Sequence, residues 1–444
     1  MEVLSKLEKE GISIRINQTF RIKHPSKVWS SLPESVKENL RHNLTYLKLS
    51  AYGALAKEQF KFNIHPPSLK EYFDKCARRD FPRFAHEDHM SPAMLKRNFN
   101  DTEFIFQKGN PIVSEENVVM DDGAVLGLSF GKDSLLSYGI IRELGLPIRL
   151  VFFEDTWDVE LEHKKKLIKD FEKEFNEKIN TVYDDLDNVH SEPCLNEFHS
   201  EGVYGSNAMN AYMLMTLPFT YYFKINQIVF GNEQNFNDSI IDYKGTKCFV
   251  SYCQSSEWMV EQNKMLDILT GGKVKLVSYV EPIYNIAEIK ILFNRYPDIA
   301  KYQMSCSHVA YEDKNNRWCQ KCPMCSKAFL YIAANNKDPG IVGFTENLFD
   351  NQFRHLYPLF NPKPERIYEK PNAVRDEQLL AFLLAYKNNF KGALIDEFRE
   401  KFYDEAIARE EGLTKRFFGI HESKTIPDKY REQVLKIYQE ELGR

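Results

Sequence analysis

The chain has 444 residues, a net charge of −5 at neutral pH and eight cysteines. This length allows about two or three domains, and the apolar content is enough for a sizeable core. The acidic balance argues against non-specific binding to nucleic acid. The N-terminus is charged without an apolar signal segment, and no run of about 18 uncharged apolar residues marks a membrane helix. We therefore expect a cytoplasmic protein with no membrane or nucleic acid partner.

Four regions follow one another along the chain. Residues 1–115 mix helical stretches with polar, Pro-containing connections, and we expect an N-terminal α+β region without catalytic residues. Residues 116–300 alternate strand-like and helix-like segments. Residues 301–335 hold a cluster of cysteines and an apolar helix, and residues 336–444 form a mostly helical C-terminal region.

The second region carries the clearest pattern. Its apolar runs are VLGLSF, IRLVFFED, INTVYDDL and QIVFGNE, which begin at residues 125, 148, 179 and 227. Amphipathic or apolar helical stretches separate these runs. Strands that alternate with helices predict βαβ units and a parallel sheet, so the fold class is α/β.

The turn after the first strand has the composition of an anion site. It reads SFGKDS, residues 129–134. Backbone N–H groups and the helix dipole at such a turn point toward a phosphate. The turn is not a Walker loop, because Gly127 lies one residue too close to Gly131 and Asp133 replaces the hydroxyl that would hold magnesium. An ordinary βα turn with a Ser or Asp cap is the alternative interpretation.

Polar residues at the ends of two other strands are candidates for binding a ligand. Glu154 and Asp155 close the second strand on the side where an adenosine would lie. Asn232 and Glu233 follow the strand that begins at residue 227, where they could bind substrate, metal or ribose.

Four cysteines lie in one window of 20 residues, with the spacing Cys306-x12-Cys319-x2-Cys322-x2-Cys325. In a reducing compartment such clustering indicates metal binding rather than disulfides. Four thiolates leave no open position on a tetrahedral Zn²⁺, so we expect a structural zinc site. An iron–sulfur cluster is the main alternative.

The SFGKDS turn resembles the pyrophosphate loop of the ATP-pyrophosphatase (PP-loop) families, usually S-G-G-x-D-S, with Phe130 in place of the first Gly. The resemblance implies an adenine nucleotide alpha hydrolase-like domain whose loop holds the β- and γ-phosphates of ATP with Mg²⁺. A substrate oxygen then attacks the α-phosphorus. The implied nucleotide-binding residues are Ser129, Gly131, Lys132, Asp133, Ser134, Glu154, Asn232 and Glu233.

Longer stretches resemble the MurL family, the ATP-dependent epimerases of UDP-N-acetylmuramoyl-L-alanyl-L-glutamate. The similar stretches are SFGKDSLLS, GNEQNFND, YCQSSEWMVEQ, RWCQKCPMCSKAFLYIAA and FTENLFDN, and they fall within residues 120–355. The cysteine spacing after the loop also resembles 7-cyano-7-deazaguanine synthase, more distantly. The substrate implied is a nucleotide-linked peptide or an amino acid used in cell-wall precursor synthesis.

Epimerisation through an adenylate would need a general base near the α-carbon. Adenylation removes the carboxylate charge and makes the α-proton easier to abstract. Besides Lys132 and Asp133 of the loop, the catalytic candidates are Glu257 and Cys253, with Glu261 and Tyr252 beside them. Helical spacing also favours a solvated Glu261, and a buried Cys253 would be inert.

Two other functions remain open from the sequence. One is a PP-loop enzyme that modifies a nucleobase or tRNA through an adenylate, forming an amide or nitrile. The other is a non-catalytic, zinc-containing nucleotide-binding protein, which Phe130 in the loop would favour. The sequence leaves the oligomeric state undetermined.

Overall fold

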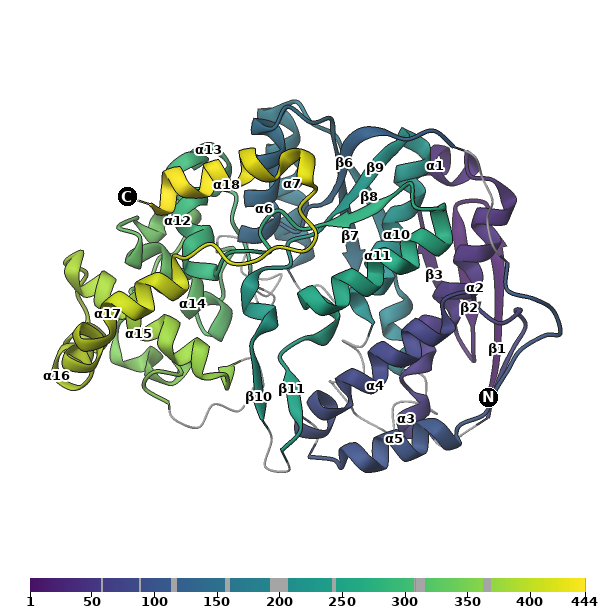
Figure 1. Ribbon diagram of the computed structural model, residues 1–444, viewed down its shortest axis with the longest axis horizontal. Coiled ribbons are helices and arrows are strands. Elements are labelled where there is room, and N and C mark those ends of the chain that lie inside the picture. The colour runs from purple at the N-terminus through teal and green to yellow at the C-terminus, as the bar shows by residue number, and fades with distance from the viewer. Residues whose placement is uncertain are drawn as a thin grey trace.

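The computed structural model describes residues 1–56, 59–87, 89–112, 118–155, 160–191, 207–241, 245–306, 308, 316–361 and 369–443. Its centre is a parallel sheet with the strand order β12-β9-β6-β7-β8 (Figure 1). These strands are β6 (Asp121–Gly127), β7 (Ile148–Asp155), β8 (Ile179–Asp184), β9 (Ile225–Val229) and β12 (Lys275–Val277). The expected alternation of strands and helices is confirmed.

The N-terminal region extends this sheet to ten strands. Its strand β3 pairs antiparallel with β8, through Ile22 opposite Asp184, and the order continues β3-β2-β1-β4-β5. The added strands are β1 (Glu2–Glu8), β2 (Gly11–Arg15), β3 (Thr19–Lys23), β4 (Phe60–Phe62) and β5 (Phe104–Ile105). One sheet therefore crosses the boundary expected near residue 115. A separate hairpin joins β10 (Ser239–Ile241) to β11 (Lys247–Phe249).

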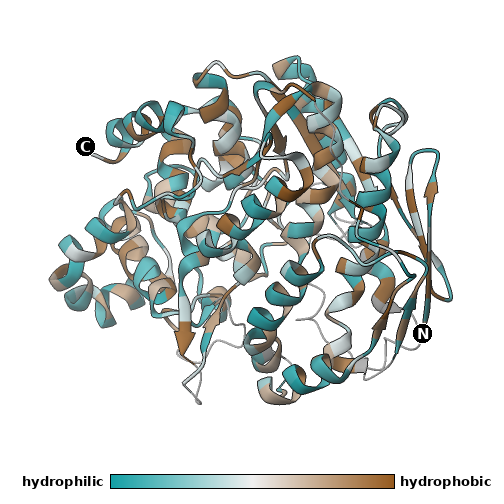
Figure 2. Ribbon diagram, turned by 45° about the vertical axis from the view of Figure 1, so that its right-hand side comes forward, coloured by the Kyte–Doolittle hydropathy of each residue, from teal (hydrophilic) through white to brown (hydrophobic). Residues whose placement is uncertain are grey.

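Helices cover both faces of the sheet, because successive strand residues point to opposite sides. Ala124 and Leu126 of β6 belong to one hydrophobic core, and Val125 belongs to the other. Hydrophobic residues accordingly concentrate on the strands and on the helix sides that face them (Figure 2). The first core includes α6 (Lys132–Glu143), α7 (Leu161–Phe175), α12 (Asn285–Arg295), α13 (Pro297–Ala300) and α14 (Pro323–Ala334).

The second core packs helices of the N-terminal region against the other face. Its members include residues of α1 (Ser26–Ser30), α2 (Glu34–Ser50), α3 (Gly53–Ala56), α4 (Lys70–Glu87), α5 (Pro92–Asp101), α10 (Ala208–Phe223) and α11 (Ser256–Thr270). A parallel sheet with both faces covered explains why its central strands are apolar on both sides.

The C-terminal helices form the end of the molecule opposite the N-terminal strands (Figure 1). They are α15 (Asn372–Lys387), α16 (Ala393–Lys401), α17 (Tyr403–Phe417) and α18 (Asp428–Leu442). The segment before α18 is fixed by Glu281, whose carboxylate accepts hydrogen bonds from the backbone N–H groups of Lys424 and Thr425. This tail therefore packs back onto the region that carries the parallel sheet.

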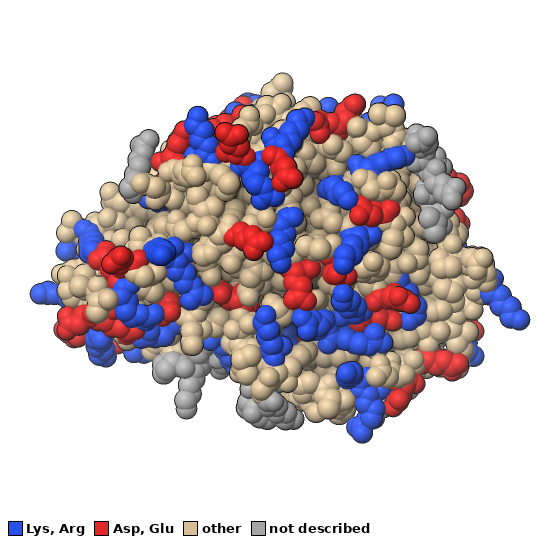
Figure 3. Space-filling model, viewed as in Figure 1, with Lys and Arg blue, Asp and Glu red and all other residues tan. Residues whose placement is uncertain are grey.

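In the described part of the chain, none of the helices combines the length and apolarity needed to cross a bilayer. Basic and acidic side chains are interspersed over the face drawn in Figure 3.

Candidate functional site

A crevice lies at the carboxyl ends of β6 and β9, where the strand order reverses. The helix after β6 packs on one face of the sheet and the helix before β9 on the other, so the connections diverge there. A cavity of about 290 Å³ occupies this position. Its lining includes Gly127, Ser129, Asp133, Phe152, Phe153, Asp155, Tyr212, Phe230, Gly231 and Asn232.

The loop of residues 129–134 makes a tight turn between β6 and α6. Phe130 has φ = +62°, a left-handed conformation that is rare for bulky residues. Its ring is buried and packs edge-on against Phe171, with 5.7 Å between the ring centroids. Its carbonyl accepts a hydrogen bond of 2.8 Å from the N–H of Met304. The turn thus has positive φ at the position where the PP-loop families carry Gly, and the buried ring offsets the backbone strain.

The loop's hydroxyl groups lie together at the crevice. The Oγ atoms of Ser129 and Ser134 are 3.3 Å apart, and Ser129 also accepts from the N–H of Gly131. Because α6 begins at Lys132, the unpaired N–H groups of its first turn also lie at this position. Together these donors give the turn the composition of an anion site.

Lys132 lies at the centre of a buried cluster of charged side chains. Its Nζ is 3.0 Å from Oε2 of Glu288 and 3.6 Å from Oε1 of Glu233, and it also contacts Asp133. Oxygen atoms of the three carboxyl groups lie within 4.8 Å of one another. Three carboxyl groups therefore surround one ammonium group, and two of them, those of Glu233 and Glu288, are buried.

Burial and mutual repulsion determine how this cluster holds protons. Burial, and then the charge of Asp133, raise the pKa of Glu233 to about 7 and that of Glu288 well above its ordinary value. Burial alone would raise the pKa of Asp133, but Lys132 and a hydrogen bond from Glu288 lower it. Asp133 is therefore the ionised partner of Lys132, and the two glutamates hold protons more readily than usual.

Three buried amide side chains beside the cluster have polar atoms without hydrogen-bond partners among the described residues. Both amide atoms of Asn232 and Asn285 and the Oε1 atom of Gln303 are unpaired. Each residue is at most 1% exposed. Leaving such groups unpaired costs about 1–3 kcal/mol each, so they are available to a ligand that could pair with them.

A second cavity, of about 540 Å³, adjoins the first across the loop. Both cavities are lined by Ser129, Asp133, Lys164, Phe236 and Gln254. The larger one also has Lys132, Glu233, Asn285 and Gln303 in its wall, with Lys327 and Tyr331 of α14. Its volume is in the range of small-molecule sites. The charged cluster thus lies where the two cavities meet.

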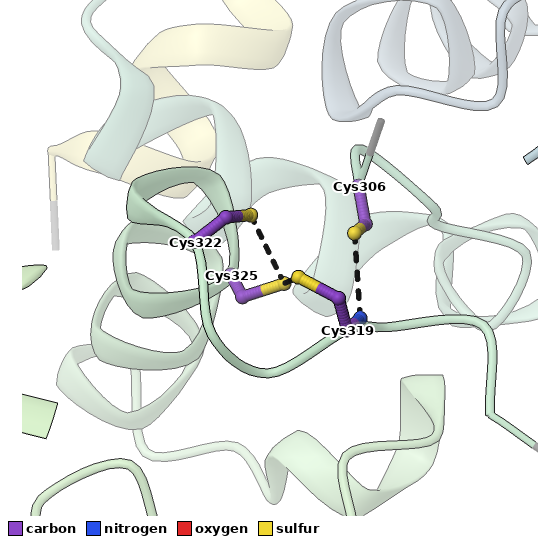
Figure 4. A group of neighbouring side chains, drawn as sticks. All are labelled: Cys306, Cys319, Cys322 and Cys325. Carbon is purple, nitrogen blue, oxygen red and sulfur yellow. Dashed lines mark hydrogen bonds between the residues drawn. The ribbon is translucent and has the colours of Figure 1, made fainter. Parts of the chain in front are cut away.

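The four predicted cysteine ligands come together (Figure 4), and their sequence neighbours Ser305, Pro323 and Met324 line the larger cavity. The Sγ atoms of Cys322 and Cys325 are 3.5 Å apart, and those of Cys319 and Cys325 are 3.7 Å apart. Thiolates about 2.3 Å from a tetrahedral Zn²⁺ stand about 3.8 Å from each other, so a single ion fits this set. An iron–sulfur cluster would keep the thiolates further apart. The residues can hold one structural metal ion such as zinc.

Three of the other predicted site residues, Glu154, Glu257 and Cys253, lie away from the two cavities. Glu154 pairs with Lys165 at 3.1 Å, whereas its neighbour Asp155 lines the smaller cavity and accepts a hydrogen bond from Tyr212. Glu257 pairs with Arg79 at 3.0 Å on a half-exposed surface of α11. Cys253 is buried, which raises the pKa of its thiol. Glu154, Glu257 and Cys253 line neither of the two cavities.

Sequence reasoning missed Glu288, Asn285 and Lys327. Glu288 stands in NIAEIKILF, at a position where helical spacing places apolar neighbours on either side of it along one face. An acidic residue within the apolar face of a helix is the signal that could have identified it. Asn285 and Lys327 had no such signal, because only the fold brings them to the cavity.

No family model, curated protein or solved structure matches the chain. The function is therefore inferred from the geometry of the site and the resemblance of its motifs.

Proposed function

We propose that the chain binds ATP across the two cavities and adenylates a carboxylate of its substrate, releasing pyrophosphate. The observation that carries this proposal is the position of the SFGKDS loop, which lies between the cavities and brings Lys132 into the buried acidic cluster. An anion-binding turn at the point where a parallel sheet reverses its order is a common location for nucleotide phosphates.

The smaller cavity suits the nucleoside. Phe152, Phe153 and Phe230 provide apolar walls for a purine, and the Asp155 carboxylate can accept a hydrogen bond from a ribose hydroxyl. The N–H groups at the start of α6, with Ser129 and Ser134, would then bind the phosphates as they extend toward the larger cavity.

The carboxyl cluster fits a magnesium ion. Mg²⁺ prefers oxygen ligands, and Asp133, Glu233 and Glu288 each offer one within 4.8 Å of the others. The ion would offset the negative charge of the triphosphate. Lys132 now balances this cluster, and it would contribute its charge to the phosphates.

The larger cavity would receive the carboxylate to be activated. The resemblance to the MurL family favours the terminal L-glutamate of UDP-N-acetylmuramoyl-L-alanyl-L-glutamate or a related peptide. Inversion at its α-carbon needs a general base with a pKa near neutrality. Glu257 does not line this cavity, and Glu233, which does, would be a ligand of the magnesium ion, so neither is assigned as the base.

The test follows two products in one reaction. Purified protein, ATP and Mg²⁺ are incubated in D₂O with UDP-N-acetylmuramoyl-L-alanyl-L-glutamate, and pyrophosphate release is measured with deuterium entry at the glutamate α-carbon. We expect both signals, and we expect Asp133→Asn to lose both. The control variant is Asp267→Asn, which changes an exposed carboxylate paired with Lys275.

The outcomes separate the possible functions. Pyrophosphate without deuterium would retain adenylation but indicate an amide- or nitrile-forming step. Neither product, together with no binding of ATP, would contradict the proposal and favour a non-catalytic protein.

A further inference from the structure

The helix α14 joins the cysteine cluster to the larger cavity. Cys322 precedes its first residue and Cys325 lies in its first turn, so two of the four thiolates are fixed to this helix. Two residues after Cys325, the side chain of Lys327 lines the cavity beside Gly131, Lys132 and Asp133. A metal ion on the thiolates would therefore determine where the start of α14, and with it Lys327, lies.

The segment that leads to Cys306 contacts the SFGKDS loop directly. Cys306 follows the segment 303–305, whose Met304 N–H donates to the carbonyl of Phe130 at 2.8 Å. The Oγ atom of Ser305 lies 3.8 Å from the point that a Cβ atom on Gly131 would occupy. Cys306 is thus attached to one wall of the anion-binding turn, and Cys325 is attached to the helix that carries Lys327.

Lys327 is half-buried and lines the larger cavity. None of the ion pairs within 4.0 Å in the described part of the chain includes it. Its positive charge nevertheless acts on two carboxyls of the cluster: it partly offsets the rise that burial gives the pKa of Glu233, and it adds to the lowering of the Asp133 pKa by Lys132. A half-buried cation that faces a cavity next to an anion-binding turn is suited to bind an anionic oxygen.

We infer that the four-cysteine cluster, with its metal ion, positions Lys327 and the SFGKDS loop on either side of one anion subsite, which binds the pyrophosphate end of the nucleotide. This inference rests on the proposed function, because it takes the smaller cavity as the nucleoside site. The loop separates the cavities, so a triphosphate that begins at Asp155 and crosses Ser129 ends on the side of Lys327. The metal then has a role in ligand affinity as well as in folding.

The test measures binding of inorganic pyrophosphate and of AMP to the metal-loaded protein by calorimetry. Lys327→Ala should weaken pyrophosphate binding at least about ten-fold and leave AMP binding unchanged, because only the anion loses a charged partner. Lys327→Arg should restore most of the affinity. The matched control is Lys321→Ala, since Lys321 is exposed in the same cysteine segment and does not line the cavity.

A double-mutant cycle tests the role of the metal. Cys306→Ser should release the metal and weaken pyrophosphate binding, and it should weaken binding less in the Lys327→Ala background than in the wild type, because the part of the effect that acts through Lys327 is already lost there. Metal content and melting temperature are measured for each variant, and Lys327→Ala should keep both at the wild-type values. Additive effects of the two changes would overturn the positioning role.

Two further results would overturn the inference, and they are distinguishable. If Lys327→Ala binds pyrophosphate as the wild type does while the wild type still binds ATP, the subsite is wrong and the proposed function remains. If the wild type binds neither ATP nor pyrophosphate, the proposed function and the subsite are both wrong.

Discussion

The Nζ atom of Lys132 lies 3.0 Å from Oε2 of Glu288, and this contact joins the SFGKDS loop to helix α12 across 156 positions of sequence. Glu288 is fully buried, so its carboxyl depends on Lys132 and on the neighbouring Asp133 for its protonation state. The contact places the ammonium group of the loop against a helix that follows the last strand of the parallel sheet.

Removing Glu288 should affect function more than stability. Glu288→Gln keeps the shape of the protonated carboxyl and leaves Asp133 to balance Lys132, so we expect a loss below about 1 kcal/mol in the free energy of unfolding. Lys132→Met leaves the carboxyls without their cation and should cost about 3–5 kcal/mol. Urea unfolding measures both values. Equal losses would show that Glu288 is ionised in the free protein.

Glu281, a buried glutamate outside the site, provides the control for the Glu288→Gln variant. Glu281 accepts hydrogen bonds from four donors in the tail before α18, which are the hydroxyl of Ser423, the backbone N–H of Lys424, and the N–H and hydroxyl of Thr425; Glu281→Gln replaces one of its two acceptor oxygens with an N–H donor. It should lower stability by about 1–3 kcal/mol and leave ATP binding unchanged, whereas Glu288→Gln should weaken Mg²⁺-dependent ATP binding at least about ten-fold.

The stability of the free protein should fall as the pH rises from about 4.5 to about 7. Glu233 and Glu288 have raised pKa values in the folded state, so the folded chain binds more protons than the unfolded chain in this range. Their contribution is complete below the unfolded pKa and is lost as the pH passes the folded pKa. The lowered pKa of Asp133 acts in the opposite direction at lower pH.

Melting temperatures recorded from pH 4.5 to 8 without added Mg²⁺ test this expectation. The melting temperature should decrease less with rising pH in a Glu233→Gln/Glu288→Gln variant, because neither position can ionise. A decrease of the same size in the variant would assign the pH dependence to other groups.

The parallel sheet and the cysteine cluster were predictable from local patterns, whereas Glu288, Asn285 and Lys327 of the site were not. The alternating runs identified β7 and β8, and ligand spacing identified the four cysteines, because both signals lie within short segments. The pairing of β3 with β8 joins residues more than 160 positions apart and has no local signal. The sequence favours Glu154 as a nucleotide contact, but neighbouring strand residues face opposite sides of a sheet. Only the packing shows that Asp155, and not Glu154, faces the smaller cavity.

The cysteine cluster should bind one Zn²⁺ per chain, and metal removal should lower the melting temperature. Cys319→Ser removes one of four thiolates and should release the ion, since a structural site with three protein ligands binds far more weakly. Cys253→Ser is the control, because Cys253 is buried away from the cluster and should leave the zinc content unchanged. Elemental analysis measures the content. Iron with visible absorption in place of zinc would contradict the prediction.

Phe130 should tolerate Gly better than Ala. Both changes delete a buried ring at a cost of about 3–5 kcal/mol, but Gly also removes the strain of φ = +62°, which is worth about 1–2 kcal/mol. We expect stability to decrease in the order wild type, Phe130→Gly, Phe130→Ala. ATP binding should persist in the Gly variant, because the families with a similar loop carry Gly there. Loss of binding in that variant would show that the ring itself supports the loop.

A single methyl group at Gly231 should disable the proposed nucleotide site without changing any charge. A Cβ atom there would lie 2.3 Å from the Cβ of Asp133, so Gly231→Ala must displace either the start of α6 or the end of β9. Because Asp133 is the ionised member of the cluster, we expect ATP affinity to fall at least about ten-fold. Zinc content should not change, since the cysteines lie on other segments.

The matched control for this substitution is Gly412→Ala in α17. No heavy atom lies within 4 Å of the added Cβ at this position, and replacing a helical glycine should stabilise the chain by up to about 1 kcal/mol. Calorimetric titration with ATP and Mg²⁺ compares the two variants. Wild-type affinity in Gly231→Ala would mean that the contact between the end of β9 and the start of α6 does not set the position of Asp133, and the proposed phosphate site would then have to be rebuilt without that carboxylate.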